Sequence, residues 1–394
     1  TLSEVKRILG FEISVEEIAR ILDSLEFKSE IRNQRSEIHV VVPDHRTDCT
    51  GPHDLIEEIA RIYGYNRFPQ AGMNDEMPPQ RSNPSLEFEE RVRDLLVQSG
   101  LTEAITYSMT TPQREARLLP GHRPDDRPYV ELANPISAER THMRHTLIAS
   151  LLEVASQNSR HHDRVAMFEI NKVYLASEDG PLPDEPRRLS IVMLGPREPL
   201  SWKRGDRTPI DFYDLKGVIE ALLRGLHVEG EDFEATEQPT YYPGRTARLT
   251  VNGTSIGMLG ELHPLVREGF DLPDQAVLAT ELDLDALSQQ VPAIVRVAEV
   301  PRFPAVTEDI ALIVDEKISA DQVLLIIMQD RGGLLKRAEL FDVFKGDRIG
   351  AGKKSLAYRL TYQADRTLTD PEVVKVREAI VKRLKEEVDA VLRG

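Results

Sequence analysis

The sequence predicts an α+β protein with several domains, because amphipathic helices and short strand-like segments alternate along the whole chain. The chain has 394 residues, of which 40% are hydrophobic and 29% charged, enough for two or three separate hydrophobic cores. Its last 94 residues show the order βαββαβ, which predicts a ferredoxin-like sandwich with two helices on one face of a sheet.

Residues 1–70 predict a small helix and strand module of a winged-helix-like or mixed type. Residues 14–17 form a capping box, and apolar residues then follow at helical spacing, which predicts an amphipathic helix. Residues 37–43 alternate as a short strand does. A second helix is expected over residues 54–63, and the side chains expected to face the core are Leu55, Ile59 and Ile62.

Residues 71–84 are predicted to form a linker, because they contain Pro78, Pro79 and Pro84 together with Gly72 and Asn74. Residues 85–292 then predict one larger domain. Strand-like segments occur at 165–170, 189–194, 247–251 and 277–282, and helices are expected at 86–98, 144–158 and 211–226. Because strands and helices mix without a strict βαβ order, we expect an antiparallel sheet with helices packed on it.

Residues 301–394 predict the C-terminal domain. The expected elements are strands at 309–315, 338–344 and 354–363, helices at 319–331 and 370–387, and a short terminal strand. On the third strand an apolar set, Leu356, Tyr358, Leu360 and Tyr362, points one way, and a small or polar set, Ser355, Ala357, Arg359, Thr361 and Gln363, points the other. The small and polar set is expected to form the open face.

The chain carries a formal net charge of −16, whereas residues 301–394 contain 17 basic and 16 acidic residues. Any contact with nucleic acid should therefore be local, because a negative surface repels phosphates. A single cysteine, Cys49, excludes an intramolecular disulfide and a multi-cysteine zinc site, and fits a reducing, cytoplasmic compartment. No apolar segment predicts a membrane span, and the start at Thr1 suggests a fragment.

Four carboxylates, Asp48, Asp54, Glu57 and Glu58, lie within eleven residues. Three of them share one helix face, where like charges repel, so a positive group is expected nearby. One possibility is Mg²⁺, which prefers oxygen ligands. The alternative is a solvated acidic face with Arg46 and Arg61 as partners.

Other patterns in the sequence give weaker evidence of function. The histidines His142 and His145 and the pair His161-His162 have no carboxylate or cysteine at ligand spacing, and no phosphate-binding glycine loop is present. The C-terminal domain contains a basic hairpin with interleaved aromatic residues, which fits either RNA binding or a solvated face. Its members are Lys345, Arg348, Lys353, Lys354 and Arg359, with Phe341, Phe344 and Tyr358.

Three sets of segments together resemble one family, the β subunit of bacterial phenylalanyl-tRNA synthetase. The first set is V-P-D-H-R-T-D-C-T-G-P-H-D-L-I-E-E-I-A-R-I-Y-G-Y-N at 42–66. The second comprises N-P-I-S-A-E-R-T-H-M-R-H-T-L-I-A-S-L-L at 134–152, F-E-I-N-K-V-Y at 168–174, D-F-Y-D-L-K-G at 211–217 and P-G-R-T-A at 243–247. The third comprises F-P-A-V-T-E-D-I-A-L at 303–312, L-F-D-V-F-K-G at 340–346, K-K-S-L-A-Y-R-L-T-Y-Q at 353–363 and R-T-L-T-D-P-E-V at 366–373.

The resemblance implies a role for each domain. Asp48, Asp54, Glu57 and Glu58 would hold Mg²⁺ at the junction with the catalytic α subunit. The central domain would be similar to a class II synthetase domain but non-catalytic, which agrees with the absence from the sequence of a Gly-rich strand ending in an ATP-binding arginine.

The C-terminal domain would be a ferredoxin-fold anticodon-binding domain, in which Asp342, Ser355 and Arg393 match positions that contact tRNA. This sequence has Thr307 and Glu308 where the family commonly has basic residues. That departure weakens the electrostatic attraction expected at this edge of the domain.

The resemblance predicts a C-terminal portion of the β subunit, lacking the family's N-terminal tRNA-binding and editing domains. The expected function is support of ATP-dependent phenylalanylation of tRNA(Phe) within an (αβ)2 heterotetramer, with ATP and phenylalanine bound in α and Mg²⁺ as the cofactor. A stand-alone RNA-binding or regulatory protein derived from the subunit is the alternative, and an independently active ligase is least expected.

Overall fold

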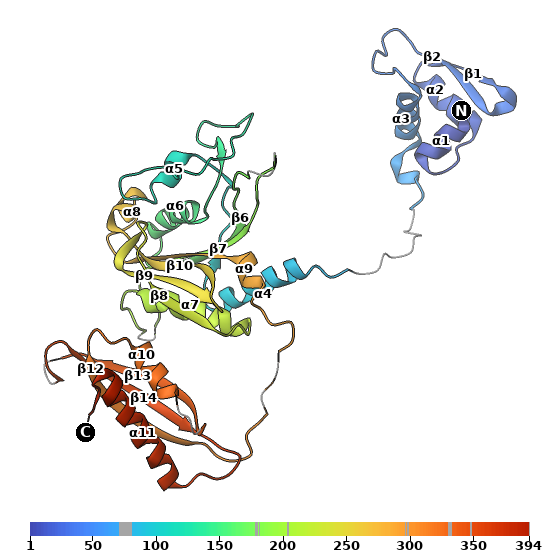
Figure 1. Cartoon of the computed structure of the whole chain (residues 1–394). Helices are drawn as coiled ribbons and strands as arrows, with labels where there is room; N and C mark the ends of the chain where they lie inside the picture. The colour runs from blue at the N-terminus through green and yellow to red at the C-terminus, as the bar shows by residue number, and fades with distance from the viewer. Residues whose placement is uncertain are drawn as a thin grey trace. The chain divides into compact units, whose positions relative to one another are not determined.

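Figure 1 shows a computed structural model of the chain, which describes residues 1–70, 81–177, 180, 182–202, 205–295, 297, 299–329, 333–346 and 349–393. The chain divides into two compact units, Thr1–Pro84 and Ser85–Gly394. Most of the predicted linker, residues 71–80, lies outside the described residues, and residues 81–83 have no regular secondary structure. Within the described residues, no helix is both long and apolar enough to cross a membrane.

The first unit contains three helices and one hairpin. These are α1 (Leu2–Leu9), α2 (Val15–Ser24), α3 (Pro52–Tyr63) and the antiparallel strands β1 (Lys28–Arg32) and β2 (Glu37–Val41), with single 3-10 turns at Asn33–Arg35 and Tyr65–Arg67. The expected helices and the strand at 37–43 are confirmed, and the Ser14 hydroxyl accepts from the Glu17 amide as a cap. Sequence patterns missed α1 and β1.

The buried face of α3 agrees with the expected one only in part. Ile56, Ile59 and Ala60 are buried, whereas Ile62 is 41% exposed and Leu55 is half-buried. The prediction is confirmed for Ile59 and in part for Leu55, which packs against the core, and is wrong for Ile62. More than one stripe of α3 carries apolar residues. Which stripe is buried depends on where α2 and the preceding loop pack, and periodicity alone does not specify that.

The central domain of the second unit is built on a seven-stranded sheet in the order β3-β6-β7-β11-β10-β9-β8. The strands are β3 (Thr102–Glu103), β6 (Val165–Lys172), β7 (Arg187–Leu194), β8 (Glu231–Ala235), β9 (Tyr241–Val251), β10 (Thr254–Leu262) and β11 (Val277–Asp283). Every neighbouring pair is antiparallel except β3 with β6, so the sheet is mixed at one edge rather than wholly antiparallel as expected.

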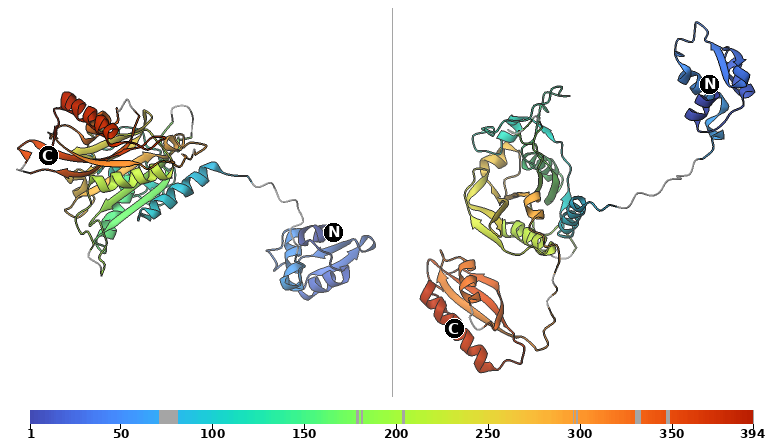
Figure 2. Two further views of the ribbon diagram at one scale, coloured as in Figure 1. Left: turned by 90° about the horizontal axis from the view of Figure 1, so that it is seen from below. Right: turned by 45° about the vertical axis from the view of Figure 1, so that its right-hand side comes forward.

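Helices cover both faces of this sheet (Figures 1 and 2). One face packs on α4 (Pro84–Gln98), α7 (Phe212–Gly225) and α9 (Leu284–Ser288), and the other on α6 (Ile148–Ser159) and α8 (Pro264–Gly269). The short helix α5 (Pro112–Ala116) and the two-stranded β4 (Met109–Thr110) and β5 (His142–Met143) precede α6. Alternate residues of a strand point to opposite faces of a sheet, so a strand that is covered on both faces needs apolar residues at nearly every position. This explains the near-continuous apolar sequence of β7.

The C-terminal domain has the βαββαβ order that the sequence predicts. Its elements are β12 (Val306–Asp315), α10 (Ala320–Met328), β13 (Leu335–Phe344), β14 (Lys353–Tyr362), α11 (Asp370–Val388) and β15 (Val391–Leu392). The strands pair antiparallel in the order β13-β14-β12-β15. The apolar set on β14 packs with α10 and α11, so the assignment of the two faces is confirmed.

The expected exposure of the other face needs one correction. Ser355 is only 3% exposed and Ala357 only 9%, although both point away from the helices. Small side chains in the middle of a sheet lie below the level of larger neighbours, and Phe344 stands on the adjacent strand opposite Ser355. This face is open to solvent mainly at its larger side chains.

Candidate metal centre and candidate nucleic-acid interface

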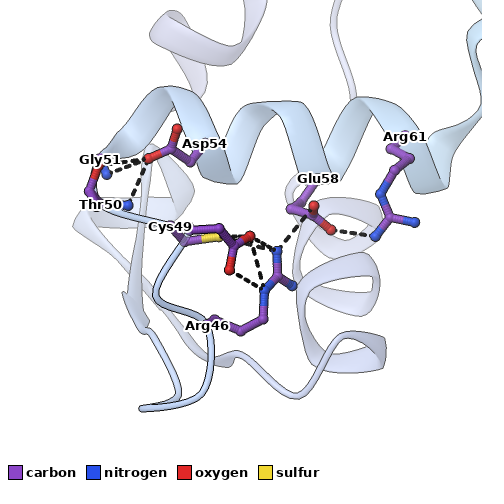
Figure 3. A network of polar contacts seen from close by, with 8 residues as sticks. Arg46, Cys49, Thr50, Gly51, Asp54, Glu58 and Arg61 are labelled. Carbon is purple, nitrogen blue, oxygen red and sulfur yellow. Dashed lines mark hydrogen bonds and ion pairs between the residues drawn. The ribbon is translucent and has the colours of Figure 1, made fainter.

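The acidic cluster of the first unit lies on the loop after β2 and on the first turns of α3. Figure 3 labels two of its members, Asp54 and Glu58. Arg46 lies between two of its members. Its Nη2 is 2.6 Å from Oδ2 of Asp48 and 3.1 Å from Oε1 of Glu58. Arg61, one turn further along α3, pairs with the other oxygen of Glu58. The positive groups expected near these carboxylates are therefore two arginines of the same module.

Asp54 has a different local role, which Figure 3 also shows. Its Oδ2 accepts from the backbone amides of Thr50 at 2.7 Å and Gly51 at 2.8 Å, so it caps the N-terminus of α3. These amide hydrogen bonds hold the pKa of Asp54 below its usual range. The Arg61 hydrogen bond similarly lowers the pKa of Glu58, and the Arg46 hydrogen bond lowers that of Asp48.

The carboxylate chemistry fits Mg²⁺, but the arrangement does not form a ligand set. Within the described residues, no three His, Cys, Asp or Glu side chains gather closely enough to hold a metal ion. Glu57 is exposed and makes no hydrogen bond or ion pair with described residues, while Asp48 and Glu58 are held by arginine. A site using all four would require Arg46 to move, and magnesium binding stays a prediction.

The three predicted tRNA contacts lie on one face of the C-terminal sheet. Asp342 pairs with Ala357, and Ala357 pairs with Ala311 on the next strand. The Arg393 amide donates to the Ala311 carbonyl at 2.8 Å, which extends the same row to the edge strand. Directly paired residues share a face, and Ser355 shares that of Ala357 because it lies two residues away. The structure therefore brings Asp342, Ser355 and Arg393 to one surface.

Aromatic rings and arginines occupy this surface. The guanidinium of Arg393 lies 5.6 Å from the ring centre of Phe344, and that of Arg359 lies 5.3 Å from the ring centre of Phe341. Phe341 is 53% exposed and Phe344 is 38% exposed. Arg359 is neutralised by Asp309, with Nε to Oδ1 at 2.8 Å, whereas Arg393 has no ion pair with a described residue. Arg393 is thus a positive side chain of this surface that stays available to a ligand.

Only some residues of the predicted basic hairpin lie together as free basic and aromatic side chains on one surface. Tyr358 points to the helices and donates to the Ala320 carbonyl at 2.7 Å, so it is not interleaved with the basic residues. Lys345 pairs with Glu316, and Arg348 lies outside the described residues. Glu308, the acidic departure from the family pattern, pairs with Arg377 of α11, which partly neutralises it.

One group of polar residues in the central domain escaped sequence reasoning. His145 was given no carboxylate partner, yet its Nδ1 lies 3.4 Å from Oδ2 of Asp125, and its backbone amide donates to Glu115 at 3.1 Å. These residues come from separate segments, and no spacing in the sequence could have connected them. They line a cavity that is described below.

The three domains define a multidomain α+β protein whose last domain presents aromatic and arginine side chains on an open sheet face, as several RNA-binding modules do. Comparison with known families identifies the domains. Residues 1–65 match the family model "tRNA synthetase B5 domain", residues 69–284 match "Phenylalanyl tRNA synthetase beta chain CLM domain", and residues 301–393 match "Ferredoxin-fold anticodon binding domain".

Curated relatives agree with these matches. The chain is 39% identical over 399 residues to the phenylalanine–tRNA ligase β subunit of Geobacillus kaustophilus, covering 100% of this chain and 48% of the relative. It is 36% identical over 393 residues to the β subunit of Clostridium tetani (99% and 48%) and 41% identical over 354 residues to that of Symbiobacterium thermophilum (88% and 39%). The chain belongs to the phenylalanyl-tRNA synthetase β-chain family, and it spans about half the length of the curated relatives it matches.

Proposed function

We propose that this chain is the C-terminal portion of a phenylalanyl-tRNA synthetase β subunit and supports the ATP-dependent attachment of phenylalanine to tRNA(Phe). The catalytic α subunit would bind ATP and phenylalanine, and this chain would contact the tRNA anticodon. The observation that carries the proposal is the row of Asp342 and Arg393 on one sheet face, in the domain that matches an anticodon-binding family.

The chemistry of that face suits a single-stranded anticodon loop. The Asp342 carboxylate can accept from a base N–H, and the Arg393 guanidinium, which no described carboxylate pairs with, can stack on a base or bind a phosphate. Phe344 and Phe341 offer rings for stacking. Ser355 is 3% exposed, so its hydroxyl would reach a base only after a neighbouring side chain moved.

Association with an α subunit, as an (αβ)2 heterotetramer, is also part of the proposal. Large apolar side chains exposed on the central domain support an interface there, because the buried centre of an interface is apolar and enriched in aromatic residues. Ile105 is 85% exposed, Tyr107 is 64% exposed and Ile136 is 94% exposed. Mg²⁺ binding by Asp48, Asp54, Glu57 and Glu58 would accompany that assembly, with the ligand set completed by rearrangement or by the partner.

The alternative, a stand-alone RNA-binding protein, would keep the anticodon face but would not alter charging by α. The relatives are named as ligase subunits, which favours the synthetase role. Mixing this chain with a cognate α subunit and measuring phenylalanylation with and without it separates the two. Charging that depends on this chain supports the proposal, and charging indifferent to it favours the alternative.

The anticodon contact is tested by Arg393→Gln, with Lys382→Gln as the matched control. Both remove one positive charge from the same domain, but Lys382 lies on α11, on the helical side, with a 77% exposed side chain. We expect Arg393→Gln to weaken tRNA(Phe) binding by about 5- to 150-fold and the control to change it little. Fluorescence anisotropy at fixed low salt measures both, and equal losses would show a purely electrostatic effect without an anticodon contact.

A further inference from the structure

A cavity of about 570 Å³ lies in the central domain, apart from the residues assigned to tRNA, α or Mg²⁺ above. Its walls come from α5 and the following loop, the start of α6, and strands β7, β10 and β11. Polar side chains line it on several sides, and an apolar part is contributed by Leu118, Ile148 and Met258. A polar cavity of this volume is large enough for a small organic molecule.

Two carboxylates lie in the cavity wall. Glu281 has an oxygen available to accept from a ligand, and Glu115 is poorly exposed to solvent. Glu281 uses Oε2 for both of its hydrogen bonds, accepting from the Thr146 hydroxyl at 2.8 Å and the Leu147 amide at 2.7 Å. Its Oε1 makes no hydrogen bond of ordinary geometry with a described residue, although the Ile148 amide lies near the carboxylate. Glu115 accepts from the Tyr129 hydroxyl at 3.0 Å and the His145 amide at 3.1 Å, and the Glu115 residue is 6% exposed.

His145 is the second, independent sign of a ligand. Its side chain is 1% exposed, it lines the cavity, and its ring stacks on Tyr129 at 3.7 Å between ring centres. Neither ring nitrogen makes a hydrogen bond of ordinary geometry with a described residue, although Nδ1 lies 3.4 Å from Asp125 and the Pro128 backbone also lies near the ring. Burial lowers the pKa of His145, so its neutral ring can accept a hydrogen bond. Buried polar atoms without partners are uncommon in proteins.

The charges of the cavity favour a cation over an anion. Three arginines line it, but Arg127 pairs with Asp125, and Arg188 pairs with Asp283 at 2.8 Å. Arg123 is exposed at the surface. The arginines near the buried wall are thus already neutralised, whereas Glu115 and Glu281 have no ion-pair partner within 4 Å in the described chain.

We propose that this cavity binds a small organic ammonium compound, with the ammonium group between Glu281, Glu115 and the His145 ring, and an aliphatic body against Leu118, Ile148 and Met258. An ammonium group carries three donors and no acceptor, which matches a wall of carboxylate and imidazole acceptors. Ion pairing would also compensate the burial of two carboxylates, which is costly while they are unpaired. The proposal does not depend on the synthetase role.

The test uses the whole chain and three probes of one shape: hexylammonium, hexan-1-ol and hexanoate. Isothermal titration and ligand-observed NMR at pH 7.5 should show hexylammonium binding at least about tenfold more tightly than the alcohol or the carboxylate. Glu281→Gln should weaken hexylammonium binding by at least about tenfold, because the amide keeps the acceptor for Thr146 but loses the charge. The matched control is Glu261→Gln, whose carboxylate pairs with Arg245 away from the cavity residues.

Each remaining outcome overturns the proposal. Equal binding of the three probes would show a nonspecific apolar cavity, and tighter binding of hexanoate would show an anion site. No binding of hexylammonium up to about 10 mM, or binding unaffected by Glu281→Gln, would also refute it. If circular dichroism shows that Glu281→Gln does not fold, Glu115→Gln replaces it with the same expectation.

Discussion

The guanidinium of Arg144 and the carboxylate of Glu169 form a fully buried ion pair in the central domain, with Nη1 to Oε1 at 3.1 Å and side-chain exposures of 0% and 1%. Arg144 precedes α6 and Glu169 lies on β6, so the pair joins a loop to the sheet. Two further hydrogen bonds support the pair: the Thr106 hydroxyl donates to Glu169 Oε2 at 2.7 Å, and Arg144 Nε donates to the Lys172 carbonyl at 3.1 Å. Arg144 Nη2 has no partner among the described residues.

Removing one charge of this pair should destabilise the central domain strongly. We expect Glu169→Gln to cost about 3–5 kcal/mol in local unfolding free energy, because the Arg144 charge would stay buried without its partner. Amide hydrogen exchange of β6 measures this locally, independently of the other domains. Glu185→Gln, which removes a surface partner of Lys172, should change exchange little. Equal effects of the two variants would contradict the expectation.

The contribution of Glu115 to the stability of the central domain should fall as pH rises from about 4.5 to 7, whereas the contribution of His145, whose pKa is lowered by burial, should rise. Burial raises the pKa of Glu115 from 4.5 to about 7. Between these values Glu115 binds more protons in the folded state than in the unfolded state, so its contribution to the unfolding free energy decreases with pH, by at most about 3 kcal/mol. Burial also raises the pKa of Glu281, which acts in the same direction.

Glu115→Gln should remove the Glu115 part of this pH dependence, because a neutral amide does not ionise. Hydrogen exchange, corrected for intrinsic rates, at pH 5 and pH 8 measures the difference for β7 and β11. Asp125, whose pKa lies at about 2 because of Arg127, is ionised throughout this range and does not contribute. An unchanged pH dependence in Glu115→Gln would show that Glu115 ionises normally.

Magnesium binding to the acidic cluster should respond in opposite directions to two substitutions. Glu57→Gln removes an exposed carboxylate and should weaken Mg²⁺ binding by at least about fivefold. Arg46→Gln should strengthen it, because Arg46 competes for Asp48 and Glu58. Calorimetric titration of the chain with its α subunit measures both. Glu12→Gln, a surface partner of Lys6, is the control, and no response to either variant would support the solvated acidic face.

Two glycines of the central domain should respond oppositely to alanine. Gly195 has φ +97°, and an added Cβ would lie 2.1 Å from the Asp163 carbonyl oxygen. Gly195→Ala should therefore destabilise the domain by more than about 1 kcal/mol. Gly217 lies within α7 with nothing within 4 Å of the added Cβ, so Gly217→Ala should stabilise by about 0.5–1 kcal/mol. Thermal unfolding measures both, and destabilisation by Gly217→Ala would contradict this reasoning.

Local sequence patterns predicted those elements whose signals lie within one segment. The capping box before α2, the period-two alternation of β14 and the order of the C-terminal elements each arise from neighbouring residues. Patterns missed β8, a five-residue edge strand with three acidic residues, and β10, which contains two glycines, because residues of these types are depleted in strands. They also missed that β3 runs parallel to β6, since pairing direction is not encoded in one strand.

For the candidate sites too, the sequence indicated some residues, and the tertiary structure decided how they are arranged. Family resemblance, rather than spacing, selected Asp342, Ser355 and Arg393, and sheet register then placed them on one face. The burial of Ser355 depends on Phe344 of the adjacent strand, which the sequence of β14 does not contain. For the acidic cluster, the sequence indicated both candidate partners, a metal ion and arginine.

The sequence by itself determined the elements with strong local signals, such as α2, β14 and α11, and which carboxylates crowd together, because these depend on periodicity and spacing over a few residues. Only the tertiary structure decided that Arg46 lies between Asp48 and Glu58. It also brought Glu115, His145 and Glu281 to one cavity, although a contact joining Glu281 to Leu147 spans 134 residues. Such contacts arise when separate elements pack around a common core, and no local pattern records where that packing places a side chain.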